Sequence, residues 1–169
     1  MTPYERVKLS RKRTAGAFPL PSPLDCIRYS LCELCEYEDA MLRLERIGDK
    51  RNNARQPDPR AELGQALYML LSAAVQWSIK PKRYDPLSEQ TRLHLYSSAL
   101  NWLTGFTLSP TSAHLVPPFS AARRVALGVP VSGAYNVLCA LATLHGWDVD
   151  TLVDDTCAAF EANRAAAQP

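Results

Sequence analysis

Three acidic residues follow one another along the sequence at about the spacing of one helical turn. Glu33, Glu36 and Asp39 lie three residues apart, so on an α-helix their side chains would form a row along one face. Like charges in such a row destabilise an isolated helix by roughly 0.2–0.5 kcal/mol per pair, and a bound cation would reverse that sign. The spacing predicts a cation-binding row, although an acidic face in contact with solvent has the same pattern.

Glu62 adds a further carboxylate near the start of the next predicted helix. If the two helices pack antiparallel, Glu62 faces Glu33 and Glu36 across the gap between them. Three or four carboxylates that converge in a helical bundle make an oxygen site of the kind that Mg²⁺ or Mn²⁺ prefers. A carboxylate that is left over can orient or deprotonate a metal-bound water for attack on phosphorus.

The elements that must position these residues are predicted to be helices throughout. Apolar residues recur with helical periodicity in five stretches, at residues 24–46, 59–80, 87–105, 131–145 and about 150–166. The proline-rich segment 106–130 is predicted to be irregular, with a short helix at 119–127. No stretch alternates as a strand would, so we expect an all-α fold, a bundle of four to five helices. The almost wholly apolar helix at 131–145 favours assembly as a dimer or tetramer.

The first 23 residues differ in composition from the rest of the chain. Basic residues come first and prolines follow: Arg6, Lys8, Arg11, Lys12, Arg13, Pro19, Pro21 and Pro23. We interpret residues 1–23 as an extended basic arm with a proline-rich linker, in front of an all-α domain at residues 24–169. The arm is either a solvated tail or a contact surface for nucleic acid or a protein.

Composition narrows the class of protein. The chain has 169 residues, of which 47% are hydrophobic and 21% charged, enough for one domain with its own core. A net charge of +2 is small for a protein that binds duplex DNA, so nucleic acid is not an expected partner. We find no apolar run of about 20 residues and no signal-peptide core. We therefore expect no membrane association and a cytoplasmic setting, bacterial or viral.

The cysteines suggest structural thiols. There are five, and an odd number does not indicate a disulfide framework. Cys32 and Cys35 form a Cys-x-x-Cys motif without a second pair, and the histidines lack the spacing of zinc ligands. We interpret the cysteines as buried residues of helices and prefer this interpretation to a zinc or redox site.

The acidic pattern resembles the all-α nucleoside triphosphate pyrophosphohydrolases, the superfamily of MazG-like proteins, dimeric dUTPases and phage dCTPases. Their signature is Glu-x-x-Glu, a spacer, and Glu-x-x-Asp on the following helix. Glu33-Leu-Cys-Glu36 is similar to the first half, and Glu62-Leu-Gly-Gln65 to the second. The resemblance covers about residues 26–78 and 131–165, which would make residues 79–130 an insertion relative to the shortest members.

The resemblance implies Mg²⁺-dependent (or Mn²⁺-dependent) hydrolysis of a (deoxy)nucleoside triphosphate to a monophosphate and pyrophosphate by a homodimer or homotetramer. It implies that Glu33, Glu36 and Glu62 are catalytic and bind the metal. Gln65 stands where the family has Asp and offers a neutral amide oxygen, so Asp39 is a candidate for the missing charge. Further candidates for binding the substrate phosphates are Asn163, Arg164, Lys50, Arg51 and Arg55.

Two other classes of function follow from the same residues. No Gly-x-x-x-x-Gly-Lys motif occurs, which excludes a P-loop NTPase. Because Gln65 carries no charge, the alternative to an enzyme is a catalytically degenerate helical module that senses nucleotides or binds a protein. A weaker alternative is a DNA-associated protein that uses the basic residues between Arg6 and Arg13.

Overall fold

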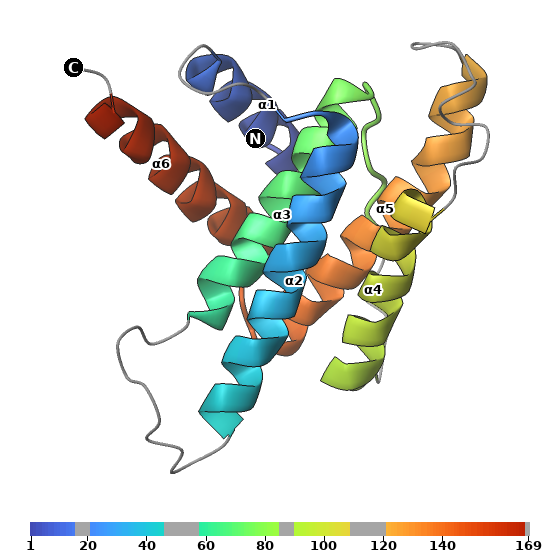
Figure 1. Ribbon diagram of the computed structural model, residues 1–169, viewed down its shortest axis with the longest axis vertical. Helices are drawn as coiled ribbons and strands as arrows, with labels where there is room; N and C mark the ends of the chain where they lie inside the picture. The colour runs from blue at the N-terminus through green and yellow to red at the C-terminus, as the bar shows by residue number, and fades with distance from the viewer. Residues whose placement is uncertain (16–20, 46–57, 85–89, 109–120, 168–169) are drawn as a thin grey trace.

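A computed structural model of the chain describes residues 1–15, 21–45, 58–84, 90–108 and 121–167 (Figure 1). Within these ranges the chain forms six helices and no strand, which confirms the all-α class. The helices are α1 (Pro3–Thr14), α2 (Pro23–Glu45), α3 (Pro59–Gln76), α4 (Arg92–Leu108), α5 (Ala121–Leu144) and α6 (Val149–Ala167). The bundle thus has one helix more than the largest number expected from the sequence.

α3 is the central helix of the bundle. It runs antiparallel to α2 and also contacts α1, α5 and α6, whereas α4 packs on α2 and α5 (Figure 1). Leucines and alanines on most sides of α3 are fully buried, among them Leu63, Leu67 and Leu70. A helix that is apolar around most of its circumference belongs in the core of a bundle, and α3 occupies that position here.

The start of α3 lies where the sequence predicts it. Asp58 accepts hydrogen bonds from the backbone N–H groups of Arg60 (3.0 Å) and Ala61 (3.3 Å), and Pro59 occupies the first helical position. An aspartate cap followed by proline satisfies backbone groups that a helix N-terminus otherwise leaves unpaired. This cap fixes the point from which Glu62 projects.

α5 corrects two expectations from the sequence. Residues 121–130, predicted to be irregular apart from a short helix, form one continuous helix with residues 131–144, and Pro130 lies inside it. An internal proline costs a helix about 3 kcal/mol because it removes a hydrogen bond and crowds the preceding turn. Leu127 before Pro130 and Val131 after it are both buried in the core, and this packing on both sides of the proline favours the continuous form.

The continuous helix also corrects the expectation that no apolar run approaches about 20 residues. Ala126–Leu144 is 19 residues long and, by length and composition alone, is apolar enough to cross a membrane. The helix expected at residues 131–145 covers only the part of this segment that follows Pro130. Just over half of this stretch is buried inside the fold. A core helix of a bundle passes the same test, so the finding is weak evidence for a membrane span.

α1 shows that the expected extended arm is wrong for residues 3–14. Thr2 caps the helix by accepting from the Glu5 N–H (3.3 Å), and Val7 is completely buried. Arg6 forms ion pairs with Asp154 (3.1 Å) and Glu161 (2.8 Å) of α6. Basic residues that suggested a solvated tail therefore hold α1 against α6, while residues 16–20 lie outside the described ranges.

Candidate metal centre

The antiparallel pairing of α2 and α3 brings the predicted carboxylates together. The Ser30 hydroxyl donates to the Ala66 carbonyl (2.8 Å), and this register places Glu62 opposite Glu33. One carboxylate oxygen from each of Glu33, Glu36 and Glu62 lies within 4.8 Å of the other two. The expectation that Glu62 faces Glu33 and Glu36 across the gap is therefore confirmed. We call these three residues the acidic cluster.

The position of the cluster on its helices explains its partial burial. Leu34 and Tyr37 on the inner face of α2 are completely buried. Glu33 and Glu62 are half-buried beside this apolar interface, whereas Glu36 is exposed. Glu62 lies in the first turn of α3, where the positive end of the helix dipole stabilises a carboxylate.

The electrostatics of the cluster disfavour three negative charges. The pKa of Glu33 is raised to about 7 by burial, by a hydrogen bond with Glu62 and by the charges of Glu36 and Glu62. Neighbouring carboxylates raise one another's cost of ionisation, so Glu33 is only about half ionised at neutral pH. A divalent cation would offset the same repulsion. The donor set is all oxygen, so these residues fit Mg²⁺ or Mn²⁺.

Gln65 contacts the cluster directly. Its Nε2 donates a hydrogen bond to Oε2 of Glu62 at 3.2 Å. In this orientation the Gln65 amide acts as a hydrogen-bond donor to the Glu62 carboxylate. Rotation of the amide group would instead direct its oxygen toward the cluster as a neutral metal ligand. Gln65 therefore lies where the resemblance requires a ligand but contributes no negative charge.

Asp39 and the Cys-x-x-Cys motif lie outside the cluster. Asp39 is exposed and pairs with Arg43 on its own helix (2.7 Å), so it does not supply the missing carboxylate. Cys32 and Cys35 are free, exposed thiols, which corrects the expectation that they are buried; Cys26, Cys139 and Cys157 are buried as expected. Neither Cys32 nor Cys35 joins a metal-capable group among the described residues.

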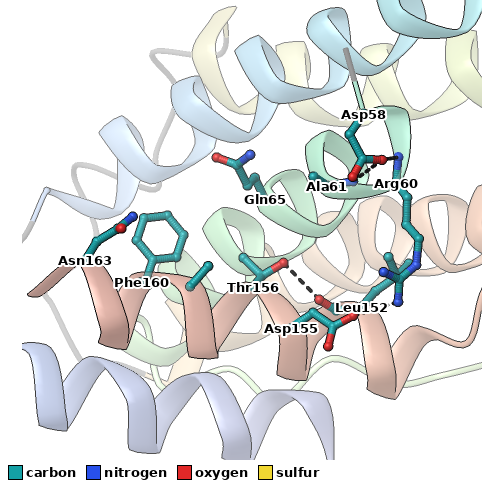
Figure 2. A pocket seen from close by; sticks show the side chains of 10 residues that line it. Asp58, Arg60, Ala61, Gln65, Leu152, Asp155, Thr156, Phe160 and Asn163 are labelled. Atoms are coloured by element: carbon teal, nitrogen blue, oxygen red, sulfur yellow. Dashed lines mark hydrogen bonds and ion pairs between the residues drawn. The ribbon is translucent and has the colours of Figure 1, made fainter. Parts of the chain in front are cut away.

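A pocket of about 410 Å³ lies between α3 and α6. Its lining includes Gln65, Phe160 and Asn163 at one end, and an ion pair between Arg60 and Asp155 (2.7 Å) at the other (Figure 2). Because Gln65 lines this pocket and also contacts Glu62, the pocket adjoins the acidic cluster. We call it the α3–α6 pocket.

The structure describes only some of the predicted phosphate-binding residues. Asn163 is exposed and lines the α3–α6 pocket. Lys50, Arg51 and Arg55 lie outside the described residues, as does the side chain of Arg164. Of the predicted set, Asn163 is thus the one residue whose side chain the described structure assigns to a pocket.

Two residues that line the α3–α6 pocket were not predicted from the sequence to be site residues. Phe160 stacks on Tyr68 (ring centroids 4.6 Å apart), and Arg60 is held by Asp155. The spacing of Phe160 and Asn163, three residues apart on a predicted helix, indicates a shared face. No comparable signal marks Arg60, because its partner lies on a helix distant in sequence.

Comparisons of the chain with models of known protein families, with functionally characterised proteins and with solved structures found no match. The superfamily assignment therefore stays a prediction, based on the residues of the acidic motifs.

Proposed function

We propose that the chain is a nucleoside triphosphate pyrophosphohydrolase that depends on Mg²⁺ or Mn²⁺. The observation that supports this proposal is the acidic cluster. Glu33, Glu36 and Glu62 come from two separate helices, yet their oxygens approach within 4.8 Å at a cost in charge repulsion. Repulsion of this kind at a half-buried site is relieved by a divalent cation, and Mg²⁺ commonly takes substrate phosphates as additional ligands.

Each residue of the acidic cluster has a defined role in the proposed reaction. Glu36 and Glu62 would hold the cation, and Gln65 orients Glu62 through its hydrogen bond. The bound cation would neutralise phosphate charge and lower the pKa of a water molecule. Glu33, with its pKa of about 7, accepts the proton of the water that attacks the α-phosphorus. The P–O bond to the leaving pyrophosphate breaks, and a nucleoside monophosphate remains.

The α3–α6 pocket is the proposed site for the nucleoside part of the substrate. A volume of about 410 Å³ is within the range of small-molecule sites. The Phe160 ring offers an apolar surface for a base, and the amides of Gln65 and Asn163 offer hydrogen bonds. Because Gln65 touches both regions, a nucleotide with its phosphates at the cluster can place its base in this pocket.

Thermal unfolding with and without Mg²⁺, and with each common ribo- and deoxynucleoside triphosphate, tests the proposal. A ligand at about a hundredfold excess over its dissociation constant stabilises a protein by about 2.7 kcal/mol. We expect nucleotide and metal to stabilise the wild type jointly, and Glu36→Gln to abolish this effect. Asp39→Asn removes a nearby carboxylate outside the cluster and should leave the effect unchanged. Absence of any joint stabilisation would contradict the proposal.

A pyrophosphate-release assay separates the enzyme from the alternative function. Gln65 in place of a fourth carboxylate supports a degenerate module that senses nucleotides. Pyrophosphate release from at least one nucleotide, lost in Glu36→Gln, identifies the enzyme. Nucleotide-dependent stabilisation without release across the whole panel identifies the sensor.

Quaternary structure and location are also proposals. Assembly as a homodimer or homotetramer follows from the resemblance and from the apolar character of residues 131–145, and light scattering on the purified chain tests it. The cytoplasmic location follows from the composition.

A further inference from the structure

A second pocket, also of about 410 Å³, lies away from the acidic cluster. It is formed by the start of α1, the segment that follows α3, the middle of α5 and the first turn of α6. Its lining includes Tyr4, Leu71, Lys80, Arg83, Tyr135 and Asp150. We call it the α1–α5 pocket. It shares no lining residue with the α3–α6 pocket.

The segment that carries Lys80 and Arg83 is held in place by a turn and by α5. Ser78 adopts a left-handed conformation with φ of 56°, and the Ile79 N–H bonds the Ala74 carbonyl (2.8 Å). A non-glycine residue in this region costs roughly 1–2 kcal/mol, so the surrounding contacts must favour the turn. The segment is thereby directed from the end of α3 across α5.

Side chains of α5 then fix the backbone on either side of Arg83. The Ser132 hydroxyl accepts from the Lys82 N–H (3.1 Å). The Asn136 amide accepts from the Tyr84 N–H (2.7 Å) and donates to the Lys82 carbonyl (2.7 Å). Three hydrogen bonds within a few residues hold the backbone of Arg83 at the edge of the pocket, although its side chain is exposed.

Two opposite charges of the lining, those of Arg83 and Asp150, have no ion-pair partner among the described residues. Among the described residues, no ion pair within 4.0 Å and no side-chain hydrogen bond involves Arg83 or Asp150. Lys80 has a partner, Glu5, at 3.6 Å. Asp150 also lies in the first turn of α6, where the helix dipole stabilises it. The exposed side chains of Arg83 and Asp150 thus line one cavity, and the pKa of the neighbouring Asp148 is lowered by hydrogen bonds to its carboxylate and also by the charge of Arg83. A ligand with both charges would pair with Arg83 and with Asp150.

The walls between these charges are apolar and aromatic. Leu71 is completely buried, Tyr135 is 5% exposed, and Tyr4 is half-buried. We infer that the α1–α5 pocket binds a small zwitterion with an apolar side chain, that is, an α-amino acid. Its carboxylate pairs with Arg83, its ammonium group pairs with Asp150, and its side chain packs on the two tyrosines. An acid or an amine alone would satisfy one charge and leave the other unpaired.

Isothermal titration calorimetry of the full chain tests this inference. The probes are L-phenylalanine and L-leucine, together with 3-phenylpropanoate, which lacks the ammonium group, and 2-phenylethylamine, which lacks the carboxylate. We expect L-phenylalanine to bind at least about tenfold more tightly than either analogue, the ratio that one ion pair of moderate strength gives. Failure of both amino acids to bind, or equal binding of either analogue, overturns the inference.

Substitutions assign the charges and separate this site from the proposed active site. Arg83→Gln and Asp150→Asn should each weaken L-phenylalanine binding about tenfold, and Asp150→Asn should also remove the advantage over 3-phenylpropanoate. Arg28→Gln and Asp39→Asn, exposed charges on α2, serve as matched controls and should bind normally. Glu36→Gln should bind the amino acid normally even if it loses nucleotide binding. Normal binding by both Arg83→Gln and Asp150→Asn contradicts the inference, and the unfolding temperature of each unliganded variant verifies that it is folded.

Discussion

The carboxyl group of Glu33 connects the acidic cluster to the stability of the protein. Its pKa is raised from 4.5 to about 7 by burial, by Glu62 and by Glu36. Between these two pH values the folded state binds more protons than the unfolded state. The contribution of Glu33 to stability is therefore fully present below about pH 4.5 and is lost as the pH rises through about 7.

Unfolding of the metal-free protein across this pH range provides the test. Between pH 4.5 and 7 the free energy of unfolding of the wild type should fall by roughly 1 kcal/mol more than that of Glu33→Gln. This figure allows for solvent screening of a half-buried group. Comparison with the variant cancels other titrating groups such as His145, whose pKa is lowered chiefly by burial. Mg²⁺ should reverse the trend of the wild type near neutral pH, because the cation binds the deprotonated carboxylate. Identical pH profiles for wild type and variant would contradict the assigned pKa.

Helical geometry explains which acidic residues could be predicted to converge. At about 3.6 residues per turn, each step of three residues falls about 60° short of a full turn. Glu36 therefore stays near Glu33, whereas Asp39 is displaced by about 120° and pairs with Arg43. Spacing predicted a row of Glu33, Glu36 and Asp39, which is wrong for Asp39. Glu62 was predicted to join the row because the two helices were expected to pack antiparallel. The hydrogen bond from the Gln65 amide to Glu62 could not be predicted, because it depends on the orientation of both side chains and not on their spacing in the sequence.

At the scale of whole elements, α3 and α6 cross closely at Gly64. A Cβ atom at this position would lie 2.5 Å from Oγ1 of Thr156 and 3.3 Å from the Leu152 carbonyl oxygen. The Thr156 hydroxyl already donates to that carbonyl (2.9 Å), so it is not free to move away without losing a bond. The absence of a side chain at Gly64 is what allows α6 to lie beside the cluster-bearing helix.

Alanine substitutions at two helical glycines test the importance of this crossing. Gly64→Ala should destabilise the fold by about 1–3 kcal/mol, because overpacking separates α3 from α6. Gly105→Ala in α4 meets no atom within 4 Å and should be neutral or stabilise by up to about 1 kcal/mol. Chemical denaturation of both variants measures the difference. Equal stabilities would show that the helices do not approach at Gly64.

Element boundaries were predictable where a local signal determines them. Asp58 and Pro59 mark the start of α3 at the residue expected from the sequence, and Asp148 accepts from the Thr151 N–H (2.8 Å) at the start of α6. Pro130 misled the assignment of α5, because tertiary burial outweighs a local helix-breaking preference. The sequence predicts local caps well, and it predicts poorly the elements whose stability comes from distant partners.

At the scale of the whole molecule, the cluster-bearing pair α2–α3 is supported from two sides. Arg92 of α4 bonds Glu38 and Glu45 of α2, the latter at 2.8 Å. On the other side α6 covers α3, and α1 covers both (Figure 1). Arg6 and Arg13 both contact Glu161 of α6, at 2.8 Å and 3.2 Å. The N-terminal helix thus helps to fix the helix that forms one wall of the α3–α6 pocket.

Substitutions at two neighbouring residues of α1 distinguish a helix docked on α3 and α6 from the solvated arm that was expected from the sequence. Val7 is completely buried, whereas Lys8 is exposed. Val7→Asn should destabilise the fold by roughly 3 kcal/mol, because it buries an amide in place of an apolar side chain. Lys8→Asn introduces the same residue into the same helix and should cost only about 0.5 kcal/mol. Denaturant unfolding compares the two variants. In a solvated arm both substitutions would be equally harmless, so a stability difference near zero would contradict the docking of α1 on α3 and α6.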